Sequence, residues 1–124
     1  MPSIDDILDQ MTPGEIVSAI ILSRKDYRFT EESLTYGFKK AAEQYPRLAS
    51  IDGDSLYNIL YTFQGGALVI LSSDCQHLYM PDSMRKTVSD VLSERCNMPD
   101  ILDKIEPVAN SVWTYEGQYA SVKK

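Results

Sequence analysis

The sequence predicts a mainly helical domain with one β-hairpin near its middle, an α+β fold. Apolar residues recur at helical spacing through most of the 124-residue chain, helix-capping signals precede these stretches, and the apolar run Ala67 to Leu71 is too short for a separate helix. The length fits one domain. We therefore expect residues 1–124 to form a single domain, with a short N-terminal helix or extension at 1–11, a helical core at 12–115 and a frayed tail at 116–124.

Two helices are predicted before residue 30. Ser3 is a suitable cap for a short helix over residues 3–10, because a hydroxyl accepts hydrogen bonds from unpaired backbone N–H groups. Thr12 and Glu15 have the spacing of a capping box. The helix that begins there and ends near Lys25 is apolar around most of its circumference, so we expect it to be buried on several sides.

Two further helices are predicted before the hairpin. The first covers residues 30–46 and contains Gly37, which costs roughly 1 kcal/mol relative to alanine inside a helix. A close contact with another helix would explain that glycine. In the second helix Asp54 or Ser55 is the expected cap, and Gly65–Gly66 is the expected end.

The hairpin is predicted over residues 67–80, with its turn at Ser72-Ser73-Asp74. Both faces of its first strand are apolar. The helices of the domain can cover one face, so the second face must meet another element or another chain. Two helices are predicted to follow, one from Pro81 and one from Asn97, and Pro107 is expected to bend or split the latter.

The predicted order of three helices, a hairpin and two C-terminal helices resembles that of a winged helix-turn-helix domain over residues 12–80. The resemblance is one of topology. A DNA-reading version would carry basic or polar side chains on its third helix. Here residues 55–64 contain no lysine or arginine, and the wing turn carries Asp74. Both features oppose sequence-specific DNA recognition through this surface.

The charge of the chain also opposes nucleic-acid binding. The formal net charge is −6 and the sequence pI is about 4.6. A basic face would reverse this expectation locally, and six residues are its candidates: Arg24, Lys25, Arg28, Lys39, Lys40 and Arg47. A transcriptional regulator that binds DNA through this face is the alternative hypothesis. No secretory signal and no membrane-spanning apolar stretch is evident, so we expect a cytoplasmic location with reduced thiols.

Few residues favour catalysis or metal binding. Cys75 and His77 lie two apart on a predicted strand and would share a face, as a thiol nucleophile and its base would. No orienting group is evident beside them. Together with Cys96 they provide three possible zinc ligands without the usual spacing, and a Cys75–Cys96 disulfide is a further alternative. We expect no enzyme activity, no cofactor and no bound metal.

The tyrosines favour a protein interface. Of the eight in the chain, Tyr57 and Tyr61 lie at i and i+4 on the flank of the helix predicted just before the hairpin, either as the half-buried edge of the core or as a partner-facing strip. The leading hypothesis is a non-enzymatic interaction module, an adaptor, inhibitor or immunity-type protein, that binds its own copy or a partner. Its interface would contain Tyr57, Tyr61, Leu68, Ile70, Leu78 and Tyr79.

Overall fold

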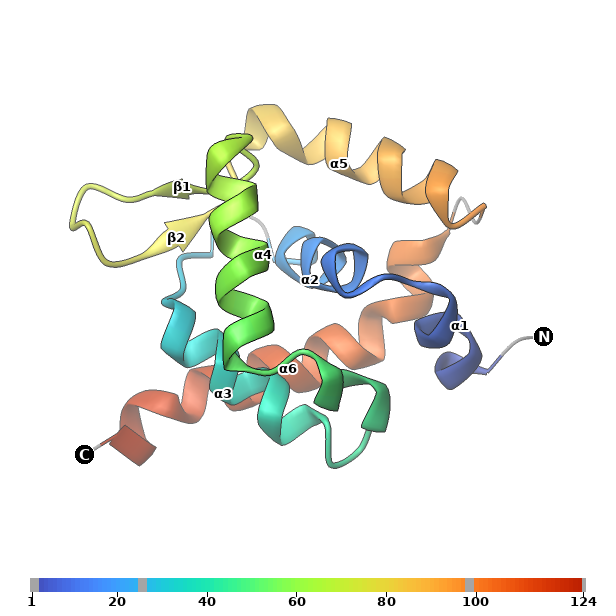
Figure 1. The fold of residues 1–124 in the computed structure, drawn as a ribbon, viewed down its shortest axis with the longest axis horizontal. Helices are drawn as coiled ribbons and strands as arrows, with labels where there is room; N and C mark the ends of the chain where they lie inside the picture. Colours follow the sequence, from blue (N-terminus) through green and yellow to red (C-terminus); the bar gives the residue numbers. More distant parts are fainter. Residues whose placement is uncertain (1–2, 25–26, 98–99, 124) are drawn as a thin grey trace.

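The computed structural model describes residues 3–24, 27–97 and 100–123. Within these residues the chain is mostly helical with one antiparallel hairpin, which confirms the α+β class (Figure 1). In chain order the elements are α1 (Ile4–Gln10), α2 (Pro13–Leu22), α3 (Glu31–Ala41), the 3₁₀ helix η1 (Pro46–Ser50), α4 (Gly53–Gly65), β1 (Ile70–Leu71), β2 (Leu78–Tyr79), α5 (Asp82–Arg95) and α6 (Ile101–Lys123).

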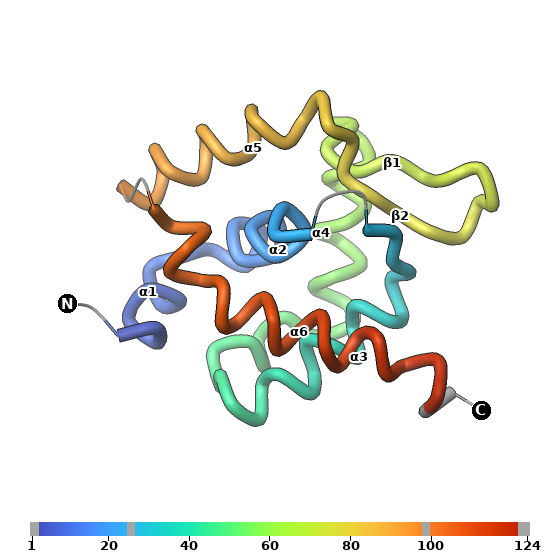
Figure 2. The backbone as a smooth tube through the Cα atoms, turned by 180° about the vertical axis from the view of Figure 1, so that it is seen from behind, coloured from blue at the N-terminus to red at the C-terminus, as the bar shows by residue number. Residues whose placement is uncertain are grey.

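Helix α2 lies at the centre of the fold, with α5 on one side of it and α3 and α6 on the other (Figures 1 and 2). Helix α4 crosses a third side. All seven residues from Ile16 to Leu22 are buried. This confirms the prediction that the helix after Thr12 is enclosed on several sides, as its apolar circumference requires.

The helix starts follow the capping signals closely. Thr12 and Glu15 form the predicted capping box: the Thr12 hydroxyl accepts the Glu15 N–H at 3.2 Å, and the Glu15 carboxylate accepts the Thr12 N–H at 2.8 Å. Helix α4 differs from its prediction. Its cap is Asp52, whose carboxylate accepts the Ser55 N–H at 2.9 Å, so Asp54 and Ser55 already lie inside the helix.

The hairpin has shorter strands than predicted. Ile70 pairs with Tyr79 and Leu71 pairs with Leu78. The residues before them complete the end of α4 instead of forming a strand, because the Leu68 N–H donates to a carbonyl in the last turn of α4 at 2.9 Å. A single-residue bridge outside the hairpin joins Leu78 to Phe29, with backbone hydrogen bonds of 2.7 and 3.0 Å.

The C-terminal segment is helical, so the prediction that residues 116–124 form a frayed tail was wrong as far as Lys123. Tertiary contacts hold this part of α6. The buried Glu116 accepts a hydrogen bond from the Tyr27 hydroxyl, and the Tyr119 hydroxyl donates to a carboxylate of α3 at 3.0 Å. Pro107 lies inside α6 on its exposed side, and α6 continues through it without being split.

Candidate functional site

The outer side of α4 is exposed and carries almost no charge. Leu56 and Leu60 point into the core, and residues spaced four apart share one side of a helix. Asp54 in the first turn is the only charged residue in α4. We call the exposed side the α4 face and define it by four residues: Tyr57, Asn58, Tyr61 and Thr62.

Tyr57 and Tyr61 are the most prominent residues of the α4 face. They are 54% and 69% exposed. The two rings stack on each other, with 6.3 Å between centroids and 20° between planes. This exposure does not fit a half-buried edge of the core, which is one of the two interpretations that the sequence left open.

A hollow of about 530 Å³ opens where α4 begins, between α3 and the C-terminal part of α6. We call it the tyrosine hollow. Tyr36 of α3 and Tyr119 of α6 have their ring centroids 5.6 Å apart, and the Tyr119 hydroxyl donates to Glu32, a bond that raises the pKa of Tyr119. The hollow is lined by three tyrosines, three carboxylates and three other residues: Tyr36, Tyr57, Tyr119, Glu31, Glu32, Asp54, Thr35, Lys39 and Gly53.

An apolar groove of about 410 Å³ lies near the other end of α4, between α2 and α5. Phe63, Leu68, Met84 and Val88 are among the residues that line it. A smaller hollow of about 250 Å³, which includes Thr62 of the α4 face, shares Phe63 with the groove. The tyrosine hollow, the α4 face and the apolar groove therefore form one continuous surface along α4.

The hairpin contributes less to this surface than the sequence predicted. Leu68 lines the apolar groove, and Ile70 and Tyr79 are half-buried. Leu78 is only 5% exposed, so its assignment to an interface was wrong. Its side chain belongs to the hydrophobic core, and its backbone pairs with β1 on one side and with Phe29 on the other. Leu71, which was not predicted as an interface residue, is 49% exposed.

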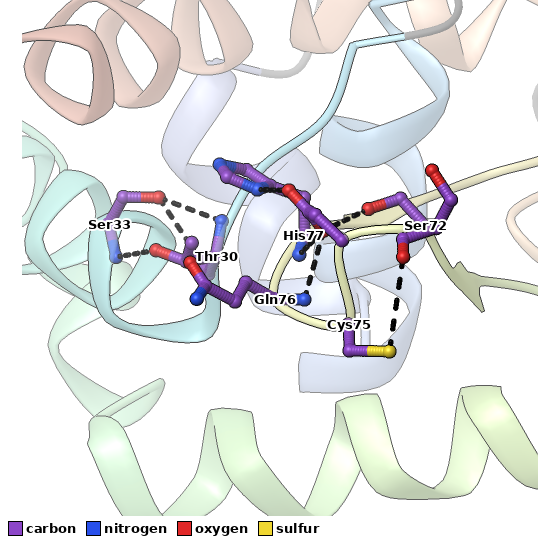
Figure 3. Close-up of polar contacts among 8 residues, drawn as sticks. Thr30, Ser33, Ser72, Cys75, Gln76 and His77 are labelled. Carbon is purple, nitrogen blue, oxygen red and sulfur yellow. Dashed lines mark hydrogen bonds and ion pairs between the residues drawn. The ribbon is translucent and has the colours of Figure 1, made fainter.

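Cys75 and His77 lie in the loop between β1 and β2 (Figure 3). The prediction that they share a strand face was wrong, because this loop turns around Asp74. The Asp74 carboxylate accepts the N–H groups of Gln76 and His77 at 2.9 and 3.0 Å, and its second oxygen lies 2.6 Å from the His77 Nδ1. The Cys75 Sγ instead lies 4.0 Å from the carbonyl oxygen of Ser73.

Asp74 is thus an orienting group for His77 that sequence reasoning missed. The Ser72 hydroxyl also donates to it, and this bond, with those from Gln76 and His77, holds the pKa of Asp74 far below its usual range. The signal was present, since an aspartate within a run of polar residues commonly closes a turn onto its own backbone. The arrangement fixes the loop and gives the thiol of Cys75 no base.

The possible zinc ligands Cys75, His77 and Cys96 do not come together. No three His, Cys, Asp or Glu side chains lie close enough to hold a metal ion in the part of the chain that the structure describes. Both thiols are free, and burial raises the pKa of Cys96. The alternative of a Cys75–Cys96 disulfide therefore does not apply to this structure.

The basic residues of the alternative hypothesis that the structure describes are distributed over several elements. Arg28 precedes α3 while Lys39 and Lys40 end it, and an 11-residue helix is about 16 Å long. Arg47 lies further along in η1, where its guanidinium donates to the backbone carbonyl that follows α1 at 3.0 Å. Lys25 lies outside the described residues.

Aromatic rings of the chain itself engage two of these arginines. The Arg24 guanidinium lies 5.5 Å from the ring centre of Tyr27 and 5.9 Å from that of Trp113. The Arg28 guanidinium lies 4.9 Å from the ring centre of Tyr79. Such cation–π contacts stabilise the local structure and hold both guanidinium groups against rings of the same chain.

The structure contains no helix that is long and apolar enough to cross a membrane, within the residues it describes. Comparisons of the chain with protein-family models, with curated proteins and with solved structures found no match. The feature with the clearest geometry for recognition is the continuous surface along α4, which joins an acidic aromatic hollow to an apolar groove.

Proposed function

We propose that this chain is a non-enzymatic protein-interaction module that binds a protein partner through the α4 face. The observation that carries the proposal is the exposed, stacked pair Tyr57 and Tyr61 on a helix face without charged side chains. The cores of protein interfaces are enriched in tyrosine and depleted of charge. Rings that already stack on each other lose little conformational freedom when a partner covers them.

The partner that fits this surface best is a different protein with basic residues around an apolar centre. The chain has a formal net charge of −6, and carboxylates of α3 and α4 border the α4 face. Such a field attracts a basic partner and repels a second copy of the same chain. Self-association through the hairpin has less support, because Val69 and Leu78 are buried within the chain itself.

A winged-helix arrangement is part of this proposal. The order α2, Phe29, α3, α4 and the hairpin supports it, as does the bridge between Phe29 and Leu78, which corresponds to a short strand added beside β2. In that arrangement α4 occupies the position of the recognition helix of helix-turn-helix proteins. The helix has no lysine or arginine, and Asp74 at the loop is ionised, so these features favour a protein ligand over DNA phosphates.

The test uses photocrosslinking in the cells that express the chain. Tyr61 is replaced by a photoreactive phenylalanine analogue, and Leu71, a similarly exposed apolar residue of the hairpin, is replaced in a matched control. We expect a crosslinked protein at position 61 and not at 71. That protein is then purified, and its affinity for the wild-type chain is compared with that for a Tyr57→Ser/Tyr61→Ser variant.

We expect the double variant to lose at least about tenfold in affinity, as interface aromatic anchors commonly do. The Leu71→Ser control should retain the wild-type affinity. A crosslink between two copies of the chain would contradict a basic partner and would show that this face forms a homodimer. Salt-sensitive retention of duplex DNA by the wild-type chain, without any protein crosslinked at position 61, would favour the alternative of a transcriptional regulator.

A further inference from the structure

We infer that the tyrosine hollow is a receptor for an arginine side chain of the protein partner. The inference rests on the proposed function, since it names the chemistry that the partner presents at the start of α4. The hollow takes one tyrosine from each of three helices: Tyr36 from α3, Tyr57 from α4 and Tyr119 from α6. A planar guanidinium stacks on such rings and forms paired hydrogen bonds with carboxylates.

The rings of the hollow suit a cation. Those of Tyr36 and Tyr119 are tilted at 50° to each other, with their centroids 5.6 Å apart, so they present differently oriented π faces. The Lys40 ammonium already lies 5.9 Å from the centre of the Tyr36 ring, within the range of a cation–π contact. Lys40 does not line the hollow, so its ammonium does not fill this space.

The charge of the hollow is complementary to arginine. Three carboxylates, from Glu31, Glu32 and Asp54, line it together with one ammonium, from Lys39. Acidic residues are favourable in the first turn of any helix, and all three carboxylates lie in first turns. That preference does not explain why the first turns of α3 and α4 meet three tyrosines around a hollow of about 530 Å³.

Tyr57 connects the hollow to the α4 face. It lines the hollow and also stacks on Tyr61, so one ring belongs to both surfaces. A partner that covers the Tyr57–Tyr61 pair would bring its neighbouring residues to the mouth of the hollow. An arginine there would be steered by the carboxylates and would be partly removed from water, which strengthens both its cation–π and its carboxylate contacts.

The direct test is an NMR titration of the ¹⁵N-labelled chain with arginine amide. Citrulline amide, which has nearly the same shape without the charge, is the matched control ligand. We expect saturable shifts at residues lining the hollow, with citrulline amide binding at least about tenfold more weakly. Equal shifts with both ligands, or no saturable shift with arginine amide, would overturn the inference.

Substitutions separate the roles of charge and ring. Asp54→Asn and Glu31→Gln should each weaken arginine amide binding about threefold or more. Asp90→Asn, at an exposed carboxylate of α5 outside the hollow, should leave it unchanged. Tyr57→Phe keeps the ring and should retain binding, whereas Tyr57→Leu should lose it. Binding that is insensitive to all of these changes would refute the assignment.

Failure of this inference can be distinguished from failure of the proposed function. If arginine amide binds in the hollow but no protein is crosslinked at Tyr61, the arginine receptor is supported and the interaction module is contradicted. If a partner is crosslinked at Tyr61, the opposite outcome can also be recognised. If its affinity for the chain is unaffected by Asp54→Asn and by alanine replacement of each of its interface arginines, the module stands and the arginine receptor is wrong.

Discussion

Gly37 of α3 lies directly against the backbone of Val112 in α6. A Cβ atom at Gly37 would lie only 2.6 Å from the Val112 carbonyl oxygen and 3.2 Å from the Cβ of Glu116. Side-chain carbons do not approach backbone oxygens so closely without displacement. This contact is the close helix approach that the glycine predicted, and it lets α3 and α6 pack along each other.

We expect Gly37→Ala to lower the free energy of unfolding by about 2–3 kcal/mol, because overpacking outweighs the gain of roughly 1 kcal/mol that alanine brings inside a helix. Urea denaturation measures the change. Gly117→Ala is the matched control, since a Cβ atom at Gly117 would meet nothing within 4 Å apart from its chain neighbours and the backbone of its own helix. It should raise the same quantity by about 1 kcal/mol. Equal effects of the two substitutions would contradict the contact.

Ala67 adopts a left-handed conformation, with φ of 61°, just after Gly66, the C-cap of α4. This conformation is strained for a residue with a Cβ, and it allows the Leu68 N–H to reach the Phe63 carbonyl at 2.9 Å. We expect Ala67→Gly to raise the free energy of unfolding by about 1 kcal/mol. Ala120→Gly, inside α6, should lower it by a similar amount. A destabilising Ala67→Gly would show that the methyl group has a packing role that outweighs its strain.

Local signals in the sequence predicted much of the fold. The capping box depends only on Thr12 and Glu15, which lie within one helical turn. Gly37 depends on one contact between two helices. The end of α4 was predicted to within about a residue, although Ala67 adopts the left-handed conformation that the Gly65–Gly66 pair would accommodate more easily.

Contacts between distant segments account for the errors. Leu78 is buried in the core, and its backbone pairs with Phe29, almost fifty residues earlier in the chain. The C-terminal part of α6 is helical where Glu116 bonds to Tyr27. Such pairings leave no periodic signal in either segment. The tyrosine hollow was missed for the same reason, since its rings come from three separate helices.

Spacing alone predicted that Tyr57 and Tyr61 share one side of a helix, and the structure confirms that they do. It did not decide whether that side was covered. A tyrosine at the edge of an apolar stripe is compatible with either state, because its ring is apolar and its hydroxyl is polar. The exposed fractions that distinguish the two depend on which side of α4 packs against α2 and α3.

Cys75 should behave as an exposed thiol that His77 does not activate. The imidazole is held by Asp74, and the nearest polar partner of the Cys75 sulfur is a backbone carbonyl. We expect iodoacetamide to label Cys75 faster than the half-buried Cys96, whose pKa is raised by burial. His77→Ala should leave the rate at Cys75 nearly unchanged. A large fall in that rate would instead reveal a thiol–imidazole pair and revive the thiol-enzyme hypothesis.

Tyr27 gives the fold a dependence on alkaline pH. Burial and the hydrogen bond that its hydroxyl donates to Glu116 raise the pKa of Tyr27 from 10.0 to about 12. A pKa that is higher in the folded state than in the unfolded state favours folding while the phenol is protonated. This contribution to stability is complete below about pH 10 and is lost as the pH rises through about 12.

Two measurements check this expectation on Tyr27→Phe, which keeps the ring and removes the hydroxyl. Titration of phenolate absorbance in the wild-type chain should show a phenol that ionises near pH 12, and this late step should be missing from the variant. The free energy of unfolding, measured with urea at increasing pH, should fall less steeply between about pH 10 and 12 in the variant.

Tyr119→Phe is the control, because the pKa of Tyr119 is also raised, by a different hydrogen bond to Glu32. In this control the late step of Tyr27 should persist. An equally steep fall in Tyr27→Phe would mean that other groups dominate the alkaline transition and that the Tyr27–Glu116 bond contributes little to it.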